Sequence, residues 1–226
     1  PPDIPLWMVA LATVFSVVIV KEAFGGTGMN VLNVALTARV FIFFAYPTYI
    51  SGDQVWIAGM SDNPDAYSGA TVLGVWAKQG FDAVQQVGFS TINQSVGYAP
   101  IDMFLGFIPG SIGETSKLAV LIGALILIWT GVGSWRIMLS VFVGAFVMGL
   151  LLNAMDLAFD FNNPHLSVPA YYHLIAGGLA FGAVFMATDP VTAAQTTTGK
   201  YIYGFLVGVL SIVIRVLNPA YPEGVM

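Results

Sequence analysis

Long apolar segments recur along this chain, and they constrain its fold more than any other feature. A helix that crosses a membrane needs about 20 mainly apolar residues, and the sequence predicts roughly six such helices. Charged residues make up only 8% of the 226, against about a quarter in a soluble domain, so there are too few charges to cover a water-facing surface. We therefore expect an all-α membrane protein with one transmembrane domain over residues 1–226. The expected spans are 6–24, 31–50, 117–131, 134–155, 171–188 and 200–217.

The composition also excludes several kinds of site. There is no cysteine and there are only two histidines, so the chain offers no disulfide, no thiolate metal site and no iron–sulfur ligands, and we expect no metal ligands. No basic cluster points to nucleic acid, and no catalytic triad or Walker loop points to a hydrolase or kinase. Because Pro1-Pro2-Asp3 is not a usual start, we expect a fragment of a longer subunit.

Two polar interruptions, Gly25 to Asn33 and Asp189 to Gly199, lie next to strongly apolar segments. Non-helical backbone at membrane depth is tolerated only where protein or a cavity satisfies its polar groups. Paired broken segments in two halves of a chain indicate inverted repeats around a central site. Two ordinary interfacial loops are the alternative, and the spacing leaves both open.

A polar region over about residues 51–116 separates the second and third apolar segments, and we expect it to lie outside the membrane. It contains Asp65-Ala66-Tyr67-Ser68-Gly69-Ala70-Thr71. The Gly-Ala step leaves Thr71 sterically open, and such a loop suits enzymatic modification of a hydroxyl. An ordinary surface loop is the alternative, because Ser-Gly is a common turn dipeptide. Further along, Ser111 and Glu114 have the spacing of a capping box, in a glycine-rich loop that could also hold an anion before a helix.

Several polar side chains stand in or beside apolar segments. Arg39 lies inside an apolar run, where a cation is costly, so we expect it to face a partner or to snorkel. Asn30 and Asn33 would share one face if helical and could read the edge of a heterocycle; helix capping by Asn30 is the alternative. Arg215 lies near the end of its span, which favours snorkelling. His173, at a helix start, is interpreted as an interface anchor.

Two pairs of glycines have the spacing of close helix packing in membranes. They are Gly178-x-x-x-Gly182 and Gly204-x-x-x-Gly208. We interpret both as packing sites and not as functional sites.

Motifs over almost the whole length resemble one family of membrane subunits. The family contains the NqrB subunit of the sodium-translocating NADH:quinone oxidoreductase, a translocase that uses NADH and ubiquinone. The RnfD subunit of the Rnf ferredoxin:NAD complex shares several motifs and is one alternative; a flavin-free small-solute channel of the same fold is another. The motifs are Lys21-Glu22-Ala23-Phe24-Gly25-Gly26-Thr27-Gly28, Ala45-Tyr46-Pro47, Ser68-Gly69-Ala70-Thr71, Ile108-Pro109-Gly110-Ser111-Ile112-Gly113-Glu114, Phe185-Met186-Ala187-Thr188-Asp189-Pro190-Val191 and Asn218-Pro219-Ala220-Tyr221-Pro222-Glu223-Gly224.

The resemblance implies a fold similar to urea transporters, with broken or re-entrant segments in an inverted-repeat bundle, and two flavins. FMN would be esterified to Thr71 by a flavin transferase outside the cytoplasm, and riboflavin would be bound noncovalently. The protein would relay electrons from a neighbouring subunit's flavin through FMN to riboflavin and quinone, coupled to Na+ transport across the bacterial inner membrane. The implied site residues are Asp65, Ser68, Gly69, Ser111 and Glu114 near FMN, Asn30, Asn33 and Arg39 near riboflavin, and Phe41 and Phe43 near quinone.

The chain departs from the family pattern in two ways. Val34 stands where the family usually has proline after the second asparagine. The upstream part that contributes to the quinone site and the last spanning helix are missing. We therefore expect the fragment to be inactive alone.

Overall fold

A computed structural model describes residues 4–50, 55–56, 68–69, 71–79, 100–108, 110–111, 113–159, 163 and 166–218. Over these ranges the chain is helical except for one short antiparallel ribbon, in which β1 (Val55–Trp56) pairs with β2 (Ser68–Gly69). This confirms the all-α class. The helices are α1 (Leu6–Ser16), η1 (Val17–Lys21), η2 (Glu22–Phe24), α2 (Val34–Ala45), η3 (Pro47–Tyr49), α3 (Val72–Gln79), α5 (Pro100–Leu105), α6 (Lys117–Trp129), α7 (Trp135–Phe159), α8 (Ala170–Ile175), α9 (Leu179–Phe181), η4 (Gly182–Met186) and α10 (Thr197–Leu217).

Three helical segments are long and apolar enough to cross a membrane: Leu6–Phe24, α7 and α10. They correspond to the first, fourth and sixth expected spans. The second and third are shorter apolar helices, α2 and α6. The fifth expected span is not one helix, because α8 ends at Ile175 and a residue with positive φ, Gly177 (φ 67°), separates it from α9. The expectation of about six spans is thus met only in part within the described ranges.

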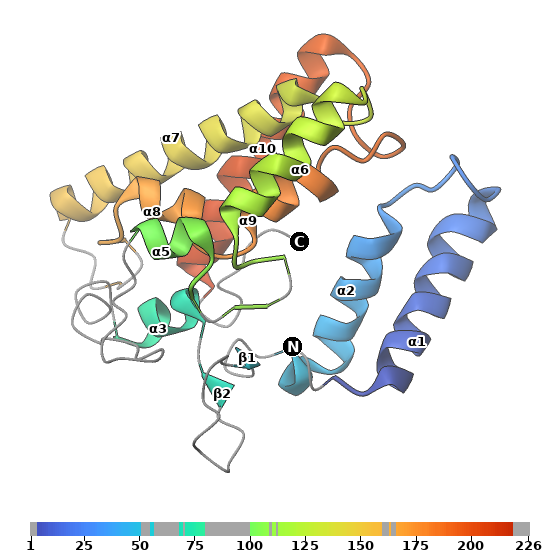
Figure 1. Cartoon of the computed structure of the whole chain (residues 1–226), viewed down its shortest axis with the longest axis horizontal. Coiled ribbons are helices and arrows are strands. Elements are labelled where there is room, and N and C mark those ends of the chain that lie inside the picture. Colours follow the sequence, from blue (N-terminus) through green and yellow to red (C-terminus); the bar gives the residue numbers. More distant parts are fainter. Residues whose placement is uncertain are drawn as a thin grey trace.

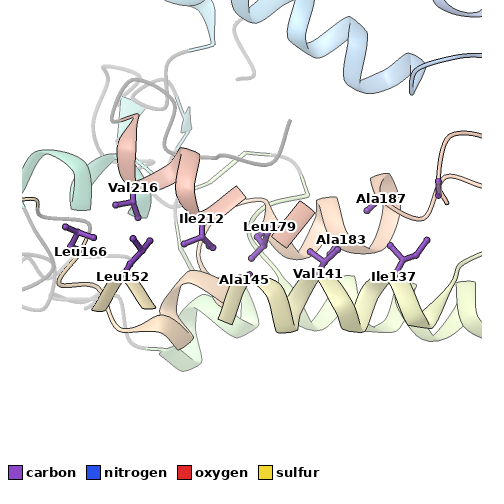
Figure 2. Close-up of a cluster of buried hydrophobic side chains, with 11 residues drawn as sticks. Ile137, Val141, Ala145, Leu152, Leu166, Leu179, Ala183, Ala187, Ile212 and Val216 are labelled. Carbon is purple, nitrogen blue, oxygen red and sulfur yellow. The ribbon is translucent and has the colours of Figure 1, made fainter. Parts of the chain in front are cut away.

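The core lies between α7 and α10, whose backbones touch at glycines. A Cβ on Gly204 would stand 2.7 Å from the carbonyl oxygen of Ile137, and one on Gly208 would overlap the carbonyl oxygen of Val141. The predicted packing role of Gly204-x-x-x-Gly208 is therefore confirmed. Figure 2 shows the apolar side chains that fill the remaining space, with Ile212 of α10 near Ala145 of α7.

Helices α1 and α2 pack on each other and stand apart from the α7–α10 core (Figure 1). The Phe15 and Phe41 rings stack with centroids 4.6 Å apart, and the Ser16 hydroxyl donates to the Val34 carbonyl at 2.5 Å. The outer surfaces of α1, α6 and α7 expose many large apolar side chains. This is the surface that lipid would cover.

The two polar interruptions have matching surroundings. Each follows a five-residue π-helical segment, η1 or η4, and each ends at a residue that caps the next helix. Asn33 accepts hydrogen bonds from two N–H groups of α2 at 3.0 and 3.1 Å, and Thr196 accepts one from α10 at 3.1 Å. Since π segments are rare in helices and frequent at functional sites, their occurrence at both breaks supports a pairing of the two.

Candidate functional site

Thr71 stands immediately before α3. Its Oγ1 accepts a hydrogen bond from the Gly74 N–H at 3.2 Å, so the hydroxyl satisfies one of the N–H groups that every helix start leaves without a partner. The side chain is only 4% exposed, and the expectation of a sterically open Thr71 is therefore wrong for this conformation. Ser68 and Gly69 form β2 just upstream, while Asp65 lies outside the described residues.

Helix α3 docks through its apolar face onto the broken α8–α9 segment. Leu73 and Trp76 are both fully buried. The Trp76 ring meets Tyr172 edge-on at 5.8 Å and His173 at 6.5 Å between centroids. In Figure 1, α3 lies below α5 and α8, and Met103 of α5 belongs to the same buried cluster. The element that follows Thr71 is thus fixed to the part of the fold where a spanning helix is interrupted.

Gly177 is the contact point between α3 and the break. Its φ of 67° disfavours any side chain. A Cβ there would overlap the Leu73 side chain and lie 3.3 Å from Nη2 of Arg215. A glycine at this position therefore allows both the turn and the close approach of Leu73 and Arg215.

Two buried cations bind the carbonyl groups at the end of α8. Arg215 is completely buried and donates from Nη1 to the His173 carbonyl at 2.8 Å and from Nη2 to the Ala176 carbonyl at 3.4 Å. Lys117, 4% exposed, donates to the Gly177 carbonyl at 2.8 Å. The C-terminal carbonyls of a helix have no intrahelical partners and carry partial negative charge. The two side chains therefore complete the broken helix and place positive charge beside α3.

Sequence reasoning missed this cationic cluster. Arg215 does not snorkel, because its guanidinium is enclosed by α8, and His173 is 1% exposed and is not an interface anchor. Lys117 gave no signal beyond its place at a helix start. The adjacent Gly177-Gly178 pair was the available clue, since a break inside an apolar segment needs donors from elsewhere in the protein.

The loop before α6 is closed by its own side chains. Oε2 of Glu114 accepts from the Ser111 N–H at 3.1 Å and from its hydroxyl at 2.7 Å, which is one half of the predicted capping box. The helix itself is capped by Ser116, whose Oγ accepts from the Ala119 N–H at 3.2 Å. Glu114 is 5% exposed, and across the described ranges neither it nor Ser111 is hydrogen-bonded to Thr71.

Asn30 and Asn33 do not share a helical face, because α2 begins only at Val34. Asn33, and not Asn30, is the cap. Asn30 donates from Nδ2 to the Leu32 carbonyl at 3.0 Å. The acceptor Oδ1 of Asn30 and the donor Nδ2 of Asn33 take no part in these bonds. Arg39 is half-buried on α2, where it forms no hydrogen bond with the described residues.

The two aromatic residues expected near quinone lie on α2. Phe41 stacks on Phe15 of α1, and Phe43 meets the neighbouring Phe44 edge-on with centroids 5.5 Å apart. Phe41 thus helps to join α1 to α2. A quinone at this face stays a prediction.

Comparison with known proteins places the chain. All of it, residues 1–226, matches the family described as NQR2, RnfD, RnfE. The chain belongs to this family. Three curated relatives, each matched over the whole of this chain, are named as the NqrB subunit of Na(+)-translocating NADH-quinone reductase. They come from Chromohalobacter salexigens (54% identical), Azotobacter vinelandii (50%) and Klebsiella pneumoniae (50%). The chain spans about half the length of these relatives, 51 to 52%.

Proposed function

We propose that this chain is the flavin-carrying membrane part of the NqrB subunit of a Na+-translocating NADH-quinone reductase, with FMN joined to Thr71 through a phosphoester. Family membership over all 226 residues and the names of the relatives support this assignment. The observation that carries it is the position of Thr71, the last residue of the hydroxyl-rich motif and the first before α3.

The surroundings of Thr71 fit a phosphoester in charge. Such an ester carries negative charge, and the start of a helix presents N–H groups and positive partial charge to an anion. The Gly74 N–H already points at Oγ1, the atom that would become the ester oxygen. The buried Arg215 and Lys117 add positive charge at the break on which α3 docks.

The unused amide groups of Asn30 and Asn33 fit a second, noncovalent flavin. One offers an acceptor and the other a donor, and the edge of an isoalloxazine ring offers a complementary N–H and carbonyl. When bound, flavins supply electron transfer, while the protein supplies binding, orientation and electrostatics. In the proposed role, the chain holds FMN and riboflavin between the neighbouring subunit that delivers electrons and a quinone near Phe41 and Phe43. Na+ movement would belong to the whole complex.

We further propose that the chain contains parts of two inverted repeats of the urea-transporter type. Besides the matched breaks, a short motif occurs twice: Arg39-Val40 is followed by Ala45-Tyr46-Pro47, and Arg215-Val216 by Ala220-Tyr221-Pro222. With three segments of spanning length, this supports a multi-pass protein of the bacterial inner membrane. The Thr71 loop would face away from the cytoplasm, where a flavin transferase would modify it.

Intact mass and in-gel flavin fluorescence test the central proposal. The protein is co-expressed with a flavin transferase as wild type, as Thr71→Val and as Thr196→Val, which also removes a helix-capping hydroxyl but leaves Thr71 intact. The proposal predicts a gain of one FMN less one water in wild type and in Thr196→Val only. An unmodified wild type, with the transferase active on a control protein, would contradict it and favour the flavin-free solute channel.

The RnfD subunit of a ferredoxin:NAD complex would show the same mass gain. The family description covers both kinds of protein. The assembled complex separates them, since NADH would reduce the flavin in the first case and reduced ferredoxin in the second.

A further inference from the structure

We infer that α3 is a latch that must leave its seat on α8 before Thr71 can be modified, so that the flavin transferase acts on an undocked, extended segment. The latch is α3 with its two buried side chains, Leu73 and Trp76, and the seat is the surface formed by Gly177, Tyr172 and the rest of the apolar cluster around them. This inference rests on the proposed attachment of FMN to Thr71.

The chemistry of attachment requires access that the docked state does not give. Esterification with FMN needs an activated donor, FAD, in which a phosphoanhydride bond joins FMN to AMP. The Oγ1–phosphorus bond forms, the phosphoanhydride bond breaks, AMP leaves, and the hydroxyl proton passes to a base of the transferase. The reacting atoms must approach within about 3.5 Å, with FAD and a second protein around them. A Thr71 side chain that is 4% exposed cannot meet this requirement.

The burial of Thr71 depends on the same docking that buries Leu73 and Trp76. Val72, directly after Thr71, is 2% exposed, and Leu73 and Trp76 are 0% exposed. An isolated helix of eight residues is not stable in water, so α3 would unwind once these side chains leave the seat. Undocking would therefore free the Thr71 hydroxyl and turn its flanking residues into the extended chain that an enzyme can bind.

Docking after modification would hold the product. In the docked state, the Gly74 N–H points at the Thr71 oxygen, and the remaining N–H groups at the start of α3 can face the phosphate. A phosphoester should therefore stabilise the helix that its own attachment required to open. The latch would open for modification and close more firmly afterwards.

The rate of flavin incorporation tests the latch. The full-length protein is purified from cells without the transferase, placed in lipid nanodiscs and given transferase and FAD. Leu73→Ala removes most of the side chain that contacts Gly177, and this should populate the open state and raise the rate about tenfold or more. Ile137→Ala deletes a similar volume from the α7–α10 core and should leave the rate unchanged. Trp76→Ala, which vacates the other half of the seat, should act like Leu73→Ala.

Amide hydrogen exchange on the unmodified wild type gives a test without substitution, since the α3 amides must open at least as fast as flavin is incorporated. Incorporation faster than this opening, or a wild-type rate equal to that of Leu73→Ala, would overturn the latch. A peptide of residues 63–79 separates this failure from failure of the proposed function. If the peptide and the wild-type protein are modified at the same rate, only the latch is refuted. If neither the peptide nor any full-length variant gains flavin, attachment at Thr71 is refuted as well.

Discussion

Replacing Gly208 by alanine should separate α7 from α10, and the structure allows the cost to be worked out. The added methyl group would overlap the carbonyl oxygen of Val141 and lie 2.7 Å from the backbone nitrogen of Ala145. Both are main-chain atoms of α7, so no side-chain rotation can relieve the contact and the helix as a whole must shift.

Two opposing terms set the size of the effect. Overpacking of a well-packed core costs about 1–3 kcal/mol, and contact with a rigid backbone places this site at the upper end. Alanine regains about 1 kcal/mol, because glycine is the poorer helix former. Gly208→Ala should therefore lower the free energy of unfolding by about 2 kcal/mol. Circular dichroism during SDS titration of the protein in mixed micelles measures this loss.

Gly123→Ala on α6 is the matched control. Its methyl group would meet the ring of Phe185, which is 39% exposed and can rotate away, so the stability should stay within about 1 kcal/mol of wild type. Equal stabilities for Gly208→Ala and Gly123→Ala would refute the backbone packing of α7 on α10.

Two further substitutions test the α1–α2 unit. Asn33→Ala should destabilise the protein by about 1 kcal/mol through loss of the helix cap, with Asn33→Asp close to wild type, as measured by the same titration; no difference between the two would argue against capping. A double-mutant cycle of Phe15→Leu and Phe41→Leu should give a coupling energy of about 0.5–1.5 kcal/mol, and a coupling near zero would contradict the stacked pair.

The sequence predicted those parts of the fold that depend on local pattern. Apolar runs of about 20 residues located α7 and α10, and the four-residue glycine spacing located their contact at Gly204 and Gly208. The two interruptions were also predicted, since clusters of polar residues and glycine beside apolar segments mark breaks. Local composition is sufficient in these cases because the membrane imposes one rule on every segment.

The parts that depend on distant partners were not predicted. Arg215 looked like a snorkelling side chain because its partners, the carbonyls at the end of α8, are about 40 residues away in sequence and become available only when that helix breaks. Thr71 looked open because its loop is rich in small residues, whereas its burial comes from Leu73 and Trp76 docking on a later segment. Such contacts have no periodicity that a sequence can display.

Peptide mass mapping of the protein from its native membranes tests the central claim most directly. Cleavage after Arg39 and Lys78 releases residues 40–78, the single tryptic fragment that contains Thr71. The account predicts that this fragment carries one FMN phosphoester and that fragmentation places it on Thr71. An unmodified fragment 40–78, or a flavin on a different hydroxyl, would contradict the account.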